Sequence, residues 1–149
     1  MKITDNLEND IINAPQWFHD GIKDVPEDKI VENNLGDISY SKWASNNESQ
    51  NLILFIHGTG AHKKWWDPIA PQFKDHANVI AIDLPGMGES GFREKYSIKD
   101  FGDCVISVIE KEKLETDINN VYIVGHSLGG QVAGYVASER QELITSLII

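Results

Sequence analysis

The apolar residues of this chain gather in short runs that alternate with longer mixed segments. These runs lie at residues 52–56, 79–82, 121–124 and 143–149. A short apolar run is typical of a β-strand that is covered on both faces, as in a parallel sheet. Two further segments, 30–33 and 38–43, flank the turn-type residues 34–37 and predict an antiparallel pair at one edge of the sheet.

Helical spacing of apolar residues appears between the predicted strands. Residues 98–114 carry a helical stripe that starts after Ser97, with Asp100 placed for a capping box and residues 111–113 on the solvated side. An Asp-Pro pair at 67–68 offers the start of a second helix. Its apolar stripe is Trp66, Ile69, Ala70 and Phe73. Strands that alternate with helices predict an α/β fold with a mostly parallel, doubly wound sheet.

The domain organisation follows from length and polarity. Residues 1–28 are mostly polar, so we expect a surface arm that is pinned to the body by Trp17 and Phe18. Residues 30–149 carry the strands and helices of the core. With 149 residues, of which 41% are hydrophobic, the chain can bury one core. This predicts a single domain or part of one.

The charge balance argues against two kinds of partner. The formal net charge is −10, and the one local basic cluster is the pair Lys63 and Lys64, so neither nucleic acid nor an anionic membrane surface is expected as a partner. No run approaches the ~20 apolar residues of a membrane-spanning helix. The N-terminus also lacks the apolar core of a secretion signal. We therefore expect a soluble, cytoplasmic protein.

Neither a metal site nor a cofactor site is expected. The single cysteine, Cys104, falls in the helical stripe and is predicted to be buried. The five histidines lack the H-E-x-x-H and H-x-H arrangements of metal ligands. A G-x-G-x-x-G pattern at 86–91 matches a dinucleotide loop in form, but the next helix begins only after Ser97, which favours an ordinary loop.

The segment 125–129 reads Gly-His-Ser-Leu-Gly and joins an apolar strand to a helix. A G-x-S-x-G turn is so sharp that its flanking positions tolerate almost no side chain, and the serine hydroxyl is pushed out above the sheet. The unpaired N–H groups at the helix start can face an anion beside it. Ser127 is therefore the candidate nucleophile. A phosphate-binding loop is disfavoured because Gln131 and Val132 stand where that motif needs Lys and Ser or Thr.

Three segments together resemble the α/β-hydrolase superfamily. They are the oxyanion loop His-Gly-Thr-Gly at 57–60, the loop at 83–90, and the nucleophile elbow at 125–130. The resemblance implies that Ser127 is the nucleophile and that the backbone N–H groups of Leu128 and Thr59 stabilise the oxyanion, with Gly60 as a substitute for Thr59. The candidate substrate contacts are Trp66, Met87 and His126, with Trp65 as the alternative to Trp66.

The chain departs from this family after the elbow. The family order is serine, then acid, then histidine, yet only 22 residues follow Ser127, with neither histidine nor aspartate among them. Glu139 and Glu142 lie on a segment that does not normally supply the acid. His57 is expected to be structural, and His126 to be turned away by the elbow. We therefore expect an N-terminal portion of such a domain, truncated after about the sixth strand, without its acid and base.

Two functions remain open. The first is a serine hydrolase that acts on a small molecule, cleaving an ester or a related acyl or carbon–carbon bond. The second is a non-catalytic binding module of the same fold, or an inactive fragment. In either case the apolar strand at 143–149 would lie at an open sheet edge, which predicts self-association through that strand.

Overall fold

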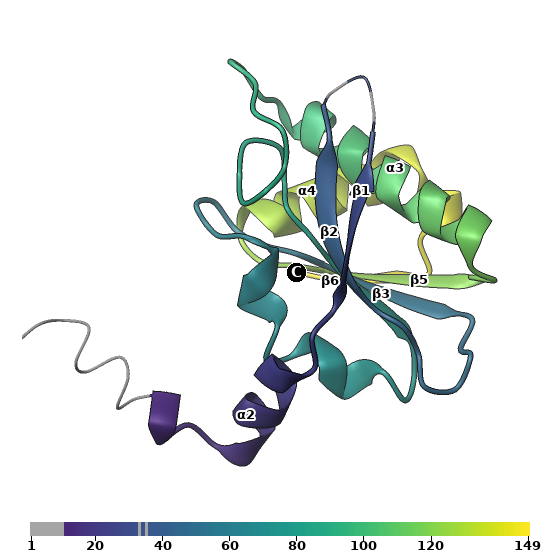
Figure 1. The fold of residues 1–149 in the computed structure, drawn as a ribbon. Coiled ribbons are helices and arrows are strands. Elements are labelled where there is room, and N and C mark those ends of the chain that lie inside the picture. Colours follow the sequence, from purple (N-terminus) through teal and green to yellow (C-terminus); the bar gives the residue numbers. More distant parts are fainter. Residues whose placement is uncertain (1–10, 33, 35) are drawn as a thin grey trace, which may run out of the picture.

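A computed structural model describes residues 11–32, 34 and 36–149 and contains one six-stranded sheet (Figure 1). The strand order is β1-β2-β4-β3-β5-β6. Their bounds are β1 Glu27–Val31, β2 Ile38–Trp43, β3 Asn51–Ile56, β4 Asn78–Ile82, β5 Asn120–Gly125 and β6 Ser146–Ile148. β1 and β2 are antiparallel at one edge, whereas β4, β3, β5 and β6 run parallel. The expected α/β architecture is confirmed. Asn33, the predicted end of the first strand, lies outside the described residues.

Two helices cover one face of the sheet, α3 (Ile98–Glu115) and α4 (Leu128–Glu139) (Figure 1). Ser97 and Asp100 form the predicted capping box at the start of α3. Alternate residues of each strand point toward these helices and form the larger core with them; Cys104 is buried there as predicted. The opposite face carries a smaller cluster around Phe55 and Trp66.

The predicted α-helix around residues 66–73 is wrong. The structure has two separate 3₁₀ turns, η1 (Lys63–Trp66) and η2 (Ala70–Phe73). Pro68 and Pro71 explain the break, because neither has the N–H donor that a continuous α-helix would need at its position. The stripe of apolar residues still packs on the sheet, since Ala70 and Trp66 belong to the smaller cluster.

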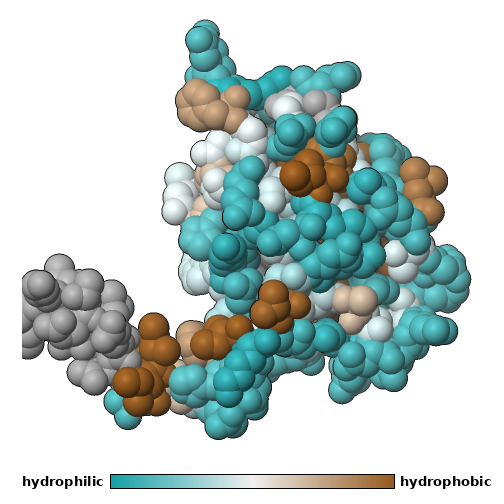
Figure 2. Space-filling view, viewed as in Figure 1, coloured by the Kyte–Doolittle hydropathy of each residue, from teal (hydrophilic) through white to brown (hydrophobic). Residues whose placement is uncertain are grey.

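The N-terminal arm contains a helix that the sequence analysis did not predict, α2 (Gln16–Lys23). Gly21 is its contact with the body, because a Cβ there would overlap the backbone of Pro68. Asp24 adds an ion pair to Lys74 and accepts a hydrogen bond from the Trp43 indole at its carbonyl. Figure 2 shows hydrophobic side chains along this projecting segment, where Trp17 is half exposed rather than buried.

The last apolar run forms a shorter and more exposed strand than predicted. A 3₁₀ turn, η3 (Gln141–Leu143), precedes β6, which pairs with β5 on one side. Ile148 and Ile149 are 64% and 76% exposed, so the buried strand expected at 143–149 is an edge strand in the described chain. Self-association through this edge stays a prediction.

Glu112 on α3 is buried, which overturns its assignment to the solvated side of the helix. Its carboxylate lies 2.6 Å from Lys42 Nζ and 3.2 Å from Lys29 Nζ, and accepts a hydrogen bond from the Tyr40 hydroxyl at 2.7 Å. Burial alone would raise the pKa of Glu112, but the hydrogen bonds and charges of these partners hold it below its usual value. The cluster ties α3 to β1 and β2.

Replacing Glu112 with glutamine is expected to lower the free energy of unfolding at pH 7 by about 3 kcal/mol, because two lysines lose their buried counter-charge. A carboxylate with a lowered pKa stabilises the fold above its unfolded pKa near 4.5 and loses this contribution as the pH falls. The difference between wild type and Glu112→Gln should therefore shrink below that pH in urea titrations. Glu139→Gln, at an exposed glutamate, is the control; a difference independent of pH would contradict the assignment.

Candidate active site

Ser127 lies at the apex of the turn between β5 and α4. Its backbone has φ 54° and ψ −115°, a conformation that non-glycine residues rarely adopt and that costs about 1–3 kcal/mol. The side chain is exposed and makes no capping hydrogen bond to the helix that follows. The turn thus holds the hydroxyl out from the sheet, as the G-x-S-x-G pattern predicts.

The two flanking glycines let helix and strand approach closely. A Cβ on Gly125 would overlap the carbonyl oxygen of Gly129, and a Cβ on Gly129 would overlap the carbonyl oxygen of Ile56. The first contact brings the end of β5 against the first turn of α4. The second packs the start of α4 against the end of β3. Side chains at either position would push the helix away from the sheet.

The predicted oxyanion loop lies beside the elbow because β3 and β5 are neighbours in the sheet. Ile56 pairs with Gly125, and the His126 N–H donates to the Ile56 carbonyl at 3.0 Å. A Cβ on Gly58 would lie 2.9 Å from His126 Nδ1 and 3.3 Å from Ser127 Cβ, so only glycine fits without displacement. Neighbouring strand ends therefore bring the loop and the nucleophile together.

The two proposed oxyanion donors have free N–H groups. Within the described part of the chain, neither the Thr59 nor the Leu128 N–H donates to another protein atom. Leu128 is the first residue of α4, whose N–H has no partner within a helix. Gly60, with φ 72°, lies in a turn closed by the Ala61 N–H and the Gly58 carbonyl at 3.2 Å.

These segments surround a hollow of about 210 Å³. Its lining residues are Gly58, Thr59, Gly60, Ala61, Trp65, His126 and Ser127. Of the predicted site residues, Ser127, Thr59, Gly60 and His126 therefore come together, and Leu128 follows directly on Ser127.

The tryptophan that lines the hollow is Trp65, the alternative to Trp66. The Trp65 ring stands edge-on to the His126 ring, with centroids 4.9 Å apart, and is half exposed. Trp66 instead stacks on Phe55 at 4.7 Å on the sheet face. Met87, the third candidate contact, packs against the larger core and does not line the hollow. Trp66 lies in a short 3₁₀ turn and Met87 in a loop. In such segments the spacing of apolar residues does not tell which way a side chain points.

His57 is structural, as the sequence analysis expected. Its ring is fully buried, and Nε2 accepts a hydrogen bond from the Leu84 N–H at 3.1 Å. Nδ1 must then carry the proton that it donates to the Gly58 carbonyl at 2.7 Å. Burial lowers the pKa of His57. Because both nitrogens are engaged away from Ser127, this histidine is not placed to act as the base.

No described residue is seen in the place of the acid or the base. In the described part of the chain, no histidine forms a hydrogen bond with the Ser127 hydroxyl. Glu142 pairs with Arg140, which lowers the pKa of Glu142. Arg140 also contacts Glu110 on α3. Glu139 is exposed at the end of α4.

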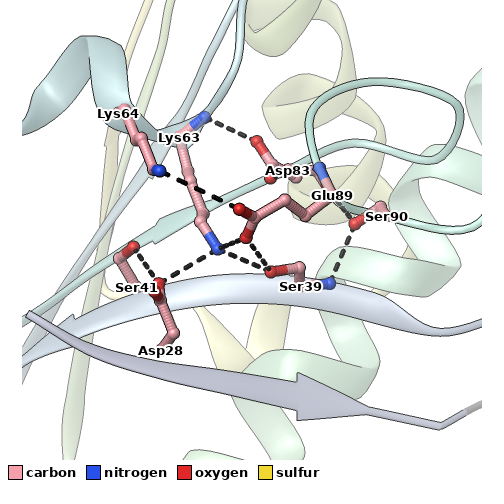
Figure 3. A network of polar contacts seen from close by, with 8 residues as sticks. All are labelled: Asp28, Ser39, Ser41, Lys63, Lys64, Asp83, Glu89 and Ser90. Carbon is pink, nitrogen blue, oxygen red and sulfur yellow. Dashed lines mark hydrogen bonds and ion pairs between the residues drawn. The ribbon is translucent and has the colours of Figure 1, made fainter.

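The sequence analysis missed one polar network close to the site. The side chain of Lys63 is 1% exposed and lies among Asp28, Ser39 and Glu89, although the sequence presents it as half of a small surface cluster (Figure 3). Nothing in its local pattern indicates burial.

The part of the chain that the structure describes contains neither a metal-binding group nor a membrane-spanning helix. No three His, Cys, Asp or Glu residues are arranged there to hold a metal ion. None of the helices there is both long enough and apolar enough to cross a membrane.

The family model for the alpha/beta hydrolase fold matches residues 51–149. A pimeloyl-[acyl-carrier protein] methyl ester esterase of Pseudoalteromonas atlantica is 35% identical over 101 residues, which cover 66% of this chain and 36% of that protein. An (E)-2-((N-methylformamido)methylene)succinate hydrolase of Acinetobacter baylyi is 30% identical over 103 residues, covering 68% and 37%. The chain thus spans less than two-fifths of the length of these relatives.

Solved structures show the same arrangement. A thioesterase domain from the curacin biosynthetic pathway has a TM-score of 0.70 at 28% identity and covers 82% of this chain and 43% of its own. An E-2-(acetamidomethylene)succinate hydrolase has a TM-score of 0.71 at 23% identity, over 82% and 43% of the two chains, and supports the fold alone.

Proposed function

The chain belongs to the alpha/beta hydrolase fold family, and on this premise we propose that it carries the nucleophile and the oxyanion hole of a serine hydrolase. The substrate would be a small molecule with an ester or a related acyl or carbon–carbon bond. The observation that carries this proposal is the position of Ser127, which is exposed in a strained turn beside two free backbone N–H groups.

The geometry supports a nucleophilic route. Ser127 Oγ would attack the carbonyl carbon while the proton of its hydroxyl passes to a general base, which no described residue supplies and which would then give the proton to the leaving group. The carbonyl electron pair would move onto oxygen, and the N–H groups of Leu128 and Thr59 would donate to that oxyanion. Collapse would then expel the leaving group and form an acyl-enzyme, which water hydrolyses to release the acid and free Ser127.

The comparisons favour an ester among the bonds of this class. One relative at 35% identity is named a pimeloyl-[acyl-carrier protein] methyl ester esterase, and one at 30% identity an (E)-2-((N-methylformamido)methylene)succinate hydrolase. The hollow of about 210 Å³ suits a small acyl or alkyl group beside the serine. Trp65 supplies an apolar wall, so we propose that the group next to the carbonyl is apolar.

Treatment with a fluorophosphonate is expected to label the protein covalently at Ser127, because this reagent reacts with an activated serine and leaves a stable adduct. Peptide mass mapping locates the adduct, and hydrolysis of p-nitrophenyl acetate measures turnover. Adduct at another residue, or the same labelling in Ser127→Ala, would contradict the assignment.

A second candidate is a ligand-binding module without turnover. It is favoured by one observation: within the described residues, the Ser127 hydroxyl has no histidine partner. Calorimetric titration with short esters distinguishes the two. Binding that survives Ser127→Ala, together with the absence of labelling and turnover in the wild type, would select the module.

A further inference from the structure

The side chain of Lys63 joins three separate segments around one buried ammonium group (Figure 3). Its Nζ lies 3.0 Å from Asp28 Oδ1 on β1, 2.6 Å from Ser39 Oγ on β2, and 2.6 Å from Glu89 Oε2 in the loop after β4. A buried ammonium is very unfavourable unless it is paired and hydrogen-bonded. The three partners therefore fix the place of this side chain closely.

The backbone of Lys63 is fixed as well, by the carboxylate of Asp83. The Lys63 N–H donates to Asp83 Oδ1 at 2.6 Å, and the Glu89 N–H donates to Asp83 Oδ2 at 2.9 Å. Ser90 closes the network, because its hydroxyl donates to the Asp83 carbonyl and accepts from the Ser39 N–H. Side chain and backbone of Lys63 are thus held by the same loop at 83–91.

The oxyanion loop at 57–60 is held in place on both sides, and the contacts of Lys63 hold the side that follows the loop in sequence. At its first end, the buried ring of His57 accepts the Leu84 N–H. At its second end, the backbone N–H of Lys63 donates to Asp83, and the Lys63 ammonium pairs with Glu89 of the loop at 83–91. The backbone contacts on the two sides of the loop therefore go to Leu84 and Asp83, which are adjacent residues just after β4. Between these contacts, Thr59 and Gly60 are exposed and have little packing of their own, so the contacts decide where the Thr59 N–H points.

We propose that Lys63 is a positioning residue that sets the oxyanion hole by clamping the segment after Thr59 to the loop at 83–91. The proposal rests on the proposed function. An oxyanion donor must lie about 3 Å from the developing charge, and a misplacement of about 1 Å can lower a rate about a hundredfold. Without the ammonium contacts to Glu89, Ser39 and Asp28, only the backbone hydrogen bond to Asp83 would hold this end of the loop. The oxyanion donor would then be placed less precisely, while substrate binding in the hollow persists.

Replacing Lys63 with methionine is expected to lower the second-order rate of fluorophosphonate labelling, and kcat for p-nitrophenyl acetate, about tenfold to a hundredfold. KM should change little, because the hollow keeps its lining. Amide hydrogen exchange of residues 58–62 should become faster in the same variant. Lys64→Met is the matched control, since its ammonium is exposed and 3.9 Å from the same Glu89; it should leave all three measurements unchanged.

Glu89→Gln covers the case in which Lys63→Met does not fold. Glu89 is 56% exposed, so this variant should fold, and it should show a smaller loss of kcat in the same direction. In a double variant the two effects should not add, because Glu89 acts through Lys63.

Unchanged kcat and unchanged exchange at 58–62 in folded Lys63→Met would overturn the clamp and leave Lys63 a stability residue. If the wild type is not labelled at all, the proposed function fails. Hydrogen exchange then still tests the clamp, so the two failures are distinguishable.

Discussion

Replacing Ser127 with alanine is expected to abolish fluorophosphonate labelling and, when the general base is present, to lower kcat for a short ester about a millionfold, because the nucleophile that forms the acyl-enzyme is removed. The backbone should hold, since alanine meets the same strain at φ 54° as serine does. Hydrolysis of p-nitrophenyl acetate measures the loss of activity, and thermal unfolding followed by circular dichroism tests whether the fold is kept. Ser138→Ala, at an exposed serine on α4, is the control.

A glycine at position 127 separates the effect of backbone strain on stability from the effect of the lost hydroxyl on activity. Glycine adopts positive φ freely, so Ser127→Gly should be more stable to unfolding than Ser127→Ala by about 1 kcal/mol, while both variants are inactive. Fluorophosphonate labelling that persists in either variant, or a loss of kcat smaller than about a hundredfold when the general base is present, would show that Ser127 is not the nucleophile.

Replacing Gly129 with alanine is expected to lower the free energy of unfolding by about 3 kcal/mol. The new Cβ would overlap the carbonyl oxygen of Ile56 and lie 2.8 Å from that of His57, and both are backbone atoms that cannot rotate away. Helix α4 would have to lift from the sheet. Urea unfolding followed by circular dichroism measures the loss.

The same helix offers a control of opposite sign. A Cβ on Gly134 meets nothing within 4 Å, so Gly134→Ala should raise the free energy of unfolding by about 0.5–1 kcal/mol through helix propensity alone. If both glycine variants changed stability by the same amount, the close approach of Gly129 to β3 would not be what requires glycine.

The parts of the fold that depend on local pattern could be predicted from the sequence. Continuous apolar runs gave the central strands because burial on both faces requires apolar residues at every position. The capping box at Ser97 and the glycines around Ser127 could be read because their geometry involves residues a few positions apart. The elbow and the oxyanion loop follow from such local requirements.

The errors concern contacts between distant segments. Lys63 and Glu112 look solvent-exposed in sequence, because the carboxylates or lysines that neutralise them come from other strands and loops. The helix expected at 66–73 matched the apolar spacing but not the two prolines within it. The choice between Trp65 and Trp66 depends on the 3₁₀ turn at 63–66, which apolar spacing does not reveal.

The placement of β3 between β4 and β5 also shapes how the protein reaches its folded state. The paired residues Asn51 and Asn120 are 69 positions apart, so the two strands that carry the oxyanion loop and the elbow meet only after a long loop closes. Closing such a loop costs chain entropy before the contacts between the strands form and offset that cost, and this slows folding. Until then the edge of β3 is unpaired and open to aggregation. The same adjacency that assembles the site thus makes it depend on a long-range contact, so a partly folded chain in which β3 and β5 are unpaired lacks the site.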